Sequence, residues 1–286
     1  MPELPEVESL TRFLDEHVRG RRIEALQLLS FAALKTFDPP LDALKGRELL
    51  GAERRGKFLA LRADTMFLVA HLARAGWLRW RPQMELKPAK LGRSPLALRV
   101  RLDDGSGMEL TEQGTEHRLA IYVVRSLDGV PGIAELGADP FSEEFDAAAL
   151  GRLLAGESGQ LKHALTDQRL IAGVGNAYSD EALHVARLSP FRRASSLDAA
   201  EVERLHGAIL EVLGDALARS EGLPLTDLKA EKKTGLRVHG RTGQPCPVCG
   251  DTVREVAFAS RSLQYCPTCQ TGGKVLADRR LSRLLK

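Results

Sequence analysis

Residues 246–269 run Cys246-Pro-Val-Cys249, then sixteen further residues, then Cys266-Pro-Thr-Cys269. Each Cys-x-x-Cys motif presents two thiolates from one tight turn, and two such turns can complete a closed tetrahedral zinc site. A closed site leaves no position for a reactive water, so the spacing predicts one structural zinc ion held by the four cysteines. Two disulfides or a redox-active pair are the alternative interpretations.

A module of this size buries too little apolar surface to fold alone, so zinc binding is expected to supply its folding free energy. The hairpin between the two motifs carries Arg254 and Arg261. A rigid cationic hairpin fits a DNA groove, and a protein-binding ribbon is the competing interpretation.

The charge of the chain is concentrated around these motifs. The whole chain has a net charge of +3, but residues 229–286 contain 12 Lys and Arg against 4 Asp and Glu, a local charge of +8. A basic segment of this kind indicates a polyanionic partner. The alternative is a solvated basic tail.

Length and composition exclude several protein classes. At 286 residues, with 43% hydrophobic and 28% charged residues, the chain predicts a folded globular protein. The longest apolar run, Met66–Ala73, is interrupted at His71 and is far shorter than the roughly 20 residues of a membrane-spanning helix. The acidic N-terminus lacks the features of a signal peptide, so we expect a cytoplasmic protein.

The first half predicts an α+β fold that begins with a helix. Pro5 suits a first helical turn, and Val7, Leu10, Leu14 and Val18 recur at helical spacing. Alternating or continuous apolar runs then predict antiparallel strands that form a β sandwich. These runs are Lys57–Leu61, Met66–Leu72, Leu96–Leu102, Met108–Thr111 and Leu119–Val124.

The second half predicts a helical domain. Asp198 and Glu201 are spaced as a capping box for the longest helix. Ser220–Gly235 is expected to be a polar connector, and Arg81–Pro95, with three prolines, a loop. The helical runs are Phe145–Leu154, Gln160–Thr166, Ala177–Ala186 and Ala199–Arg219.

We therefore expect three domains. Residues 1–134 form the N-terminal β-sandwich domain and residues 135–235 the helical domain. Residues 236–286 form the zinc finger and basic C-terminal segment, with the finger core at 237–270.

The N-terminus offers a reactive amine. Removal of Met1 before a small residue would leave Pro2 as a free secondary amine. The pKa of an N-terminal amine is about 8. Such an amine can attack an electrophilic sugar carbon, with the adjacent Glu3 as general acid or base. An ordinary helix start is the other interpretation of this Pro-Glu sequence.

Taken together, the motifs resemble those of the formamidopyrimidine-DNA glycosylase and endonuclease VIII family over essentially the whole chain. The motifs are Pro-Glu-Leu-Pro-Glu-Val-Glu at residues 2–8, Arg54-Arg55-Gly56-Lys57, Gly-Asn-Ala-Tyr at 175–178 and His239-Gly-Arg-Thr-Gly-Gln-Pro-Cys246. The resemblance implies a helix-two-turns-helix domain and a monomer that acts on damaged double-stranded DNA near the bacterial nucleoid. It also implies a bifunctional enzyme of base excision repair, which removes an oxidised base and then cleaves the strand at the abasic site.

The resemblance also implies residue roles. Pro2 is expected to be the nucleophile at the sugar C1′ and Glu3 the proton donor. Lys57 would assist β-elimination and bind phosphate, and Arg261 would bind phosphate and assist δ-elimination. For Lys57 and Arg261 the alternative is an ordinary surface charge.

Three further residues are expected to contact DNA. Asn176 follows two glycines at a predicted helix start, where backbone N–H groups favour phosphate. His71 matches a phosphate-contact histidine of the family, with a buried core histidine as the alternative. Glu6 matches an acid of the family's lesion pocket, or it simply favours the helix dipole.

Two departures from the family pattern leave the lesion preference open. Arg74 stands where the family commonly has an inserted methionine, and Leu110–Arg118 replaces the family's Asp-Pro-Arg-Arg-Phe-Gly segment. The alternative functions are therefore a non-catalytic or lyase-only protein that binds DNA damage, or a zinc-ribbon transcription or RNA-binding factor.

Overall fold

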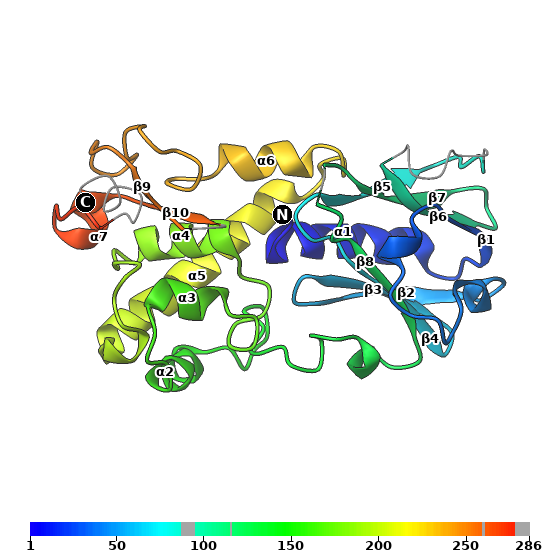
Figure 1. Ribbon diagram of the computed structural model, residues 1–286, viewed down its shortest axis with the longest axis horizontal. Coiled ribbons are helices and arrows are strands. Elements are labelled where there is room, and N and C mark those ends of the chain that lie inside the picture. The colour runs from blue at the N-terminus through cyan, green and yellow to red at the C-terminus, as the bar shows by residue number, and fades with distance from the viewer. Residues whose placement is uncertain (87–94, 115, 259–260, 278–286) are drawn as a thin grey trace, which may run out of the picture. The chain divides into compact units, whose positions relative to one another are not determined.

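The computed structural model describes residues 1–86, 95–114, 116–258 and 261–277, and the chain folds into two compact units (Figure 1). The first unit comprises Met1–Leu136 and Ser220–Lys229. The second comprises Gly137–Arg219 and the chain from Ala230 onward. The interpretation of Arg81–Pro95 as a loop falls mostly outside the described residues.

The first unit begins with helix α1 (Leu4–Val18). Pro5 lies in its first turn, and the Glu6 carboxylate accepts a hydrogen bond from the Glu3 N–H at 2.7 Å. Because apolar residues recur at helical spacing, one face of the helix is buried, as predicted: Leu4, Val7, Leu10, Leu14 and Val18.

Two four-stranded antiparallel sheets follow α1 in the chain (Figure 1). Residues from α1 and from both sheets share one hydrophobic cluster, which includes Leu10, Leu61 and Leu98. The predicted antiparallel architecture is confirmed. One sheet has the order β1 (Ile23–Leu28), β6 (Leu96–Leu102), β7 (Gly107–Glu112), β5 (Gly76–Arg81); the other has the order β2 (Leu49–Arg55), β3 (Phe58–Ala63), β4 (Met66–His71), β8 (Ala120–Val124).

The sequence did not predict strands β1, β2 and β5. All three lie at an edge of their sheet. Edge strands pair on one side only and commonly carry charged residues, which interrupt the apolar alternation that identifies a strand. The ends of β2 and β5, Glu53-Arg54-Arg55 and Arg79-Trp80-Arg81, have this character.

The prediction of a polar connector at Ser220–Gly235 is wrong in two respects. The segment contains a helix, α6 (Leu228–Thr234), and Leu225 and Leu228 are buried in the core of the first unit. Trp77 holds this segment against the first unit. Its Nε1–H donates to the Leu225 carbonyl at 3.1 Å, and its ring centroid lies 4.6 Å from Lys229 Nζ. Leu225 and Leu228 stand between polar residues and show no helical or strand periodicity. The sequence therefore gives no sign that these two leucines are buried.

The second unit contains the predicted helices. Asp198 and Glu201 form the capping box expected before α5, with hydrogen bonds of 2.8 and 3.1 Å. Short 3-10 helices occupy Phe31–Ala33, Leu41–Leu44, Leu127–Gly129 and Ala194–Ser196 along the two units. The α-helices are α2 (Ala147–Ala155), α3 (Leu161–Thr166), α4 (Asn176–Val185) and α5 (Ala199–Ser220).

The C-terminal finger consists of an antiparallel hairpin and a short helix. The hairpin strands are β9 (Arg254–Ala257) and β10 (Ser262–Tyr265), and α7 spans Pro267–Thr271. Arg254 begins β9 and Arg261 directly precedes β10, as the sequence predicted. Among the described residues, no helix combines the length and apolar character that crossing a membrane requires.

Candidate active site and metal centre

The N-terminal residues lie where α1 begins. Pro2 is buried, and Glu3 and Glu6 each expose only 3% of their surface. Met1 is bonded to Pro2 and is exposed, so its removal would free the Pro2 amine.

Lys57 lies in the two-residue turn between β2 and β3. Gly56 opens this turn at φ +55°, a conformation that glycine adopts without strain. Lys57 exposes only 8% of its surface. Arg54 fastens the turn to α1, because its guanidinium donates to the Gly56 carbonyl at 3.3 Å and to Glu8 Oε2 at 2.7 Å.

His71 ends β4 and pairs with Phe58, so it lies beside the turn that carries Lys57. The rings of His71 and Phe58 are 4.7 Å apart. Burial, and secondarily the charge of Lys57, lower the pKa of His71 to about 4. His71 is therefore neutral at pH 7, where it offers one N–H donor and one acceptor rather than a positive charge.

Asn176 is the first residue of α4 and follows Gly173, at φ +87°, and Gly175. Its side-chain amide donates to the Ser262 carbonyl on β10 at 2.7 Å. Arg261 is the residue before Ser262 and is exposed. The structure thus brings Asn176 and Arg261 to the same end of the finger hairpin, although they are far apart in the sequence.

Behind Asn176 lies a buried ion pair that the sequence analysis missed. Lys162 Nζ donates to Asp180 Oδ1 at 2.6 Å and to the Asn176 carbonyl at 2.7 Å. The other oxygen of Asp180 lies 2.7 Å from His239 Nδ1. Lys162 and Asp180 therefore set the position of the Asn176 backbone.

Glu181, the neighbour of Asp180 on α4, is also buried. Its carboxylate accepts hydrogen bonds from the backbone N–H groups of Arg237, Val238 and His239 at 2.7 to 2.9 Å. Burial raises the pKa of Glu181, against the effect of these donors. Two adjacent acids inside a helix with an otherwise buried first turn were the signal that could have identified this site.

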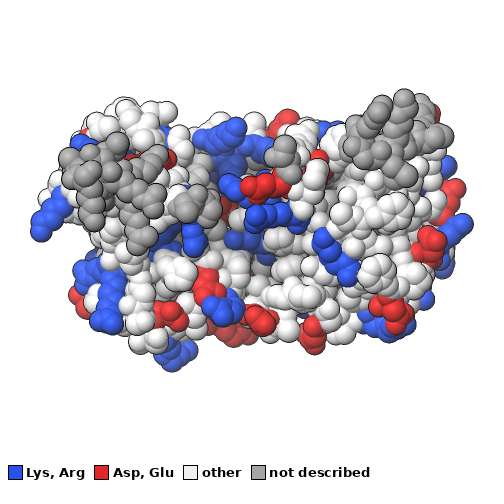
Figure 2. All heavy atoms as spheres, in the orientation of Figure 1, with Lys and Arg blue, Asp and Glu red and all other residues white. Residues whose placement is uncertain are grey.

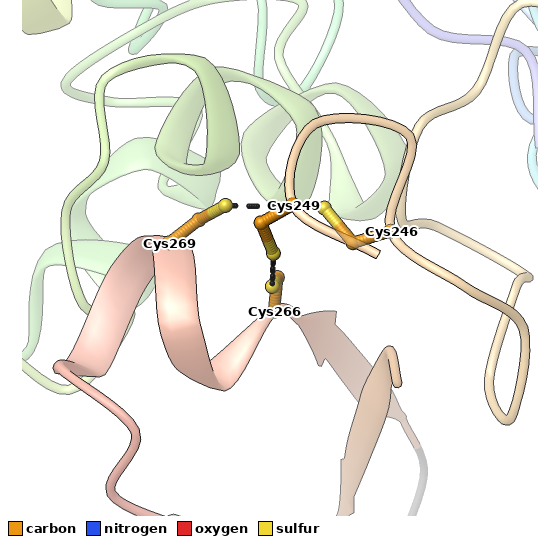
Figure 3. A group of neighbouring side chains, drawn as sticks. All are labelled: Cys246, Cys249, Cys266 and Cys269. Atoms are coloured by element: carbon orange, nitrogen blue, oxygen red, sulfur yellow. Dashed lines mark hydrogen bonds between the residues drawn. The ribbon is translucent and has the colours of Figure 1, made fainter. Parts of the chain in front are cut away.

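The four cysteine side chains point toward one another (Figure 3). All four Sγ atoms lie within 4.8 Å of one another; those of Cys249 and Cys266 are 3.3 Å apart, and those of Cys246 and Cys269 are 3.9 Å apart. A tetrahedral zinc tetrathiolate with Zn–S bonds of about 2.3 Å places its sulfurs about 3.8 Å apart. The residues therefore fit one zinc ion.

A cavity of about 640 Å³ lies beside the finger, within the second unit. Its lining includes three cationic side chains and no carboxylate, so it suits a phosphate-bearing ligand. Figure 2 shows Lys and Arg side chains gathered where α6 lies in Figure 1. The lining residues are Lys232, Lys233, Thr234, Leu236, His239, Gly240, Arg241 and Gln244.

Family models match three successive parts of the chain. Residues 1–116 match the formamidopyrimidine-DNA glycosylase N-terminal domain, residues 136–225 the H2TH domain of that enzyme, and residues 243–272 the zinc finger found in FPG and IleRS. The formamidopyrimidine-DNA glycosylase of Symbiobacterium thermophilum is 40% identical over 98% of this chain and 93% of its own length. The chain belongs to the formamidopyrimidine-DNA glycosylase family.

Other relatives agree with this assignment. A Mycobacterium tuberculosis protein, called an uncharacterized formamidopyrimidine-DNA glycosylase-like protein, is 60% identical over 55% of this chain and 99% of its own length. The crystal structure of MutM (Fpg) from Thermus thermophilus has a TM-score of 0.79 at 35% identity, covering 96% of this chain and 100% of that one. Lactococcus lactis Fpg bound to DNA containing Fapy-dG has a TM-score of 0.82 at 26% identity, covering 94% and 100%.

The family assignment confirms the predicted fold class, with its leading helix, antiparallel sheets, helix-two-turns-helix domain and four-cysteine finger. It also confirms the structural zinc ion, since the finger model covers all four cysteines. The alternative interpretations of the cysteines as disulfides or a redox pair are therefore set aside.

We expect zinc removal to unfold the finger and leave the first unit folded. The buried apolar residues of the finger form two small clusters. One is Val238 and Val253 with two of the cysteines, and the other is Val256, Leu263 and Tyr265 of the hairpin; together they are too small to hold the hairpin without metal. Hydrogen exchange after chelation should show loss of protection in β9 and β10 and retention in α1. Added zinc should restore protection and added magnesium should not; a protected hairpin in metal-free protein would contradict this expectation.

Replacing Lys57 with methionine should raise the pKa of His71, because loss of a nearby positive charge stabilises the imidazolium. Burial is the larger cause and remains, so the new pKa should stay below 6.5. NMR titration of the imidazole measures both values. Lys45→Met, at an exposed lysine, is the control and should leave the pKa unchanged. A wild-type His71 that titrates near 6.5 would refute the assignment.

Proposed function

We propose that this protein is a bifunctional DNA glycosylase of base excision repair, which removes an oxidised base and then cleaves the abasic strand. The observation that carries the proposal is the arrangement in the first unit. Pro2 and Glu3 directly precede α1, and α1 is fastened through Glu8 and Arg54 to the turn that carries Lys57. The family membership and the DNA-bound structures of relatives support the same activity.

In the proposed reaction, the Pro2 nitrogen attacks the sugar C1′ and the bond from C1′ to the base breaks. Glu3 donates a proton to the ring oxygen, the ring opens, and C1′ and the Pro2 nitrogen form an iminium ion. The iminium acidifies the C2′ hydrogen. Loss of the C2′ proton, assisted by Lys57, breaks the C3′–O bond and expels the 3′ phosphate. Loss of the C4′ proton, assisted by Arg261, then breaks the C5′–O bond and expels the 5′ phosphate, and water hydrolyses the remaining imine to free Pro2.

The proposed partner is damaged double-stranded DNA, bound by a monomer that works beside the bacterial nucleoid in the cytoplasm. Lys57, Asn176 and Arg261 are proposed to bind phosphates, and neutral His71 to donate a hydrogen bond to another. Glu6, whose carboxylate accepts from the Glu3 N–H, is proposed to face the lesion. The cationic cavity beside the finger supports a polyanionic ligand.

A second candidate function is a lyase-only or non-catalytic protein that binds damaged DNA. It is favoured by the region around Arg74, where the family commonly has a side chain that inserts into the DNA. Arg74 is 62% exposed along its side chain and lies 3.7 Å from Glu116, which also lies 3.5 Å from Arg118. Glu112 accepts hydrogen bonds from the Arg118 and Leu119 N–H groups. This charged loop offers polar side chains where base eversion commonly uses apolar ones.

Borohydride trapping on DNA with one abasic site tests the proposal. Protein that lacks Met1 should form a covalent adduct, mapped to Pro2 by mass spectrometry. Glu3→Gln should reduce excision of oxidised bases by about 10²- to 10⁴-fold, the usual contribution of a general acid, yet still be trapped on preformed abasic sites. Pro2→Gly, which has a primary amine, should reduce both reactions.

The outcomes separate the candidates. Absence of any adduct from zinc-loaded, Met1-free protein would leave the damage-binding protein as the better description. Trapping without excision of any oxidised base would leave a lyase-only enzyme.

Arg261→Ala should weaken DNA binding and reduce the salt dependence, expressed as the slope of log K against log [salt], by about 1. The reason is that one phosphate contact then releases no counterion. Arg152→Ala, which removes an exposed arginine from α2, is the charge-matched control. Equal slopes for the two variants in a fluorescence anisotropy titration would remove the phosphate assignment of Arg261.

A further inference from the structure

One face of α4 carries a row of polar side chains that contact the finger. Asn176, Asp180 and His184 are spaced four residues apart, so they lie above one another on the same side of the helix. Asn176 donates to the Ser262 carbonyl, and Asp180 accepts from the Gln264 N–H at 3.2 Å. The function proposed above uses the first residue of this row and leaves the third, His184, without a role.

His184 lies against a zinc ligand. Its ring is buried, with 3% of the residue exposed, and Nε2 is 3.3 Å from Cys246 Sγ. Nδ1 is also buried, and no described residue hydrogen-bonds to it. Because a zinc-bound thiolate can only accept a hydrogen bond, the proton belongs on Nε2 and Nδ1 keeps its lone pair.

His184 is not itself one of the zinc ligands. Among the described residues, the one group of three or more potential ligand atoms that could hold a metal ion consists of the four cysteine sulfurs. Four thiolates already complete the tetrahedral set that a structural zinc site needs. The imidazole is therefore placed to act on the centre through Cys246.

We propose that His184 is a positioning residue of the zinc centre, whose Nε2–H donates a hydrogen bond to the Cys246 thiolate. A zinc tetrathiolate carries excess negative charge, and an N–H donor stabilises the thiolate in its bound position. The same bond ties the metal centre to α4. Zinc retention by the finger is thus linked to the helix whose first residue is Asn176.

Zinc release tests the role of the bond. The full chain, loaded with zinc, is mixed with an excess of chelator, and free zinc is followed with a colorimetric indicator. His184→Phe keeps a ring of similar size but removes the donor, and it should release zinc about 10- to 100-fold faster, the usual effect of losing a hydrogen bond to a metal ligand. His184→Gln retains an N–H donor and should restore much of the retention.

His206→Phe is the matched control. This substitution, on α5, likewise removes one hydrogen bond, which joins His206 Nε2 and the Phe145 carbonyl at 2.8 Å. The His206 ring also packs against an aromatic side chain, that of Phe145. This variant should release zinc at the wild-type rate. Release from His184→Phe within twofold of wild type, or an equal effect of His206→Phe, would overturn the proposal.

If His184→Phe does not fold, an NMR measurement on the wild-type chain still tests the hydrogen bond. With ¹¹³Cd²⁺ in place of zinc, NMR should detect scalar coupling between the metal and the His184 Nε2 proton, transmitted through the Cys246 sulfur. The imidazole nitrogen shifts should show Nε2 protonated. A bare Nε2, or a protonated Nε2 without coupling, would refute the hydrogen bond.

Discussion

Two adjacent carboxylates on α4, those of Asp180 and Glu181, hold the second unit together. A buried charge is costly unless hydrogen bonds or an opposite charge replace its water. Asp180 meets this requirement with Lys162, His239 and the Gln264 N–H, and Glu181 meets it with three successive backbone N–H groups. These partners come from α3, from the start of the finger and from β10, so satisfying two charges fixes three separate segments on one helix.

In the first unit, a buried charge beside α1 is likewise paired with an opposite charge. Glu8 of this helix pairs with Arg54, whose side chain is 7% exposed, and Arg54 also donates to the turn that carries Lys57. A lysine on a free turn would sample many positions. Here the turn is fixed to the helix that directly follows Pro2 and Glu3, so the groups proposed to do chemistry lie on or beside rigid elements, as positioned catalysis requires.

Much of the fold was predictable where one face of an element is apolar. The spacing of Leu10, Leu14 and Val18 identified α1, and the alternation from Leu96 to Leu102 identified β6 with its observed bounds. Strands β1, β2 and β5 and the segment from Leu225 to Leu228 were not predicted, because their burial depends on the surface they meet and not on a local period. In the site, the cysteines were identified from spacing alone, whereas Lys162 and His184 were not, since a single polar residue inside a helical run carries no local signal.

The sequence by itself determined the zinc ligands, most helices, strands β3, β4, β6, β7 and β8, and the family, because each rests on a local spacing or an ordered set of motifs. Only the tertiary structure decided which polar residues are buried together: Arg54 with Glu8, Lys162 with Asp180, and His184 with Cys246. The physical reason is that desolvation and hydrogen bonding are properties of a position in space. They arise between residues that the chain brings together only when it has folded.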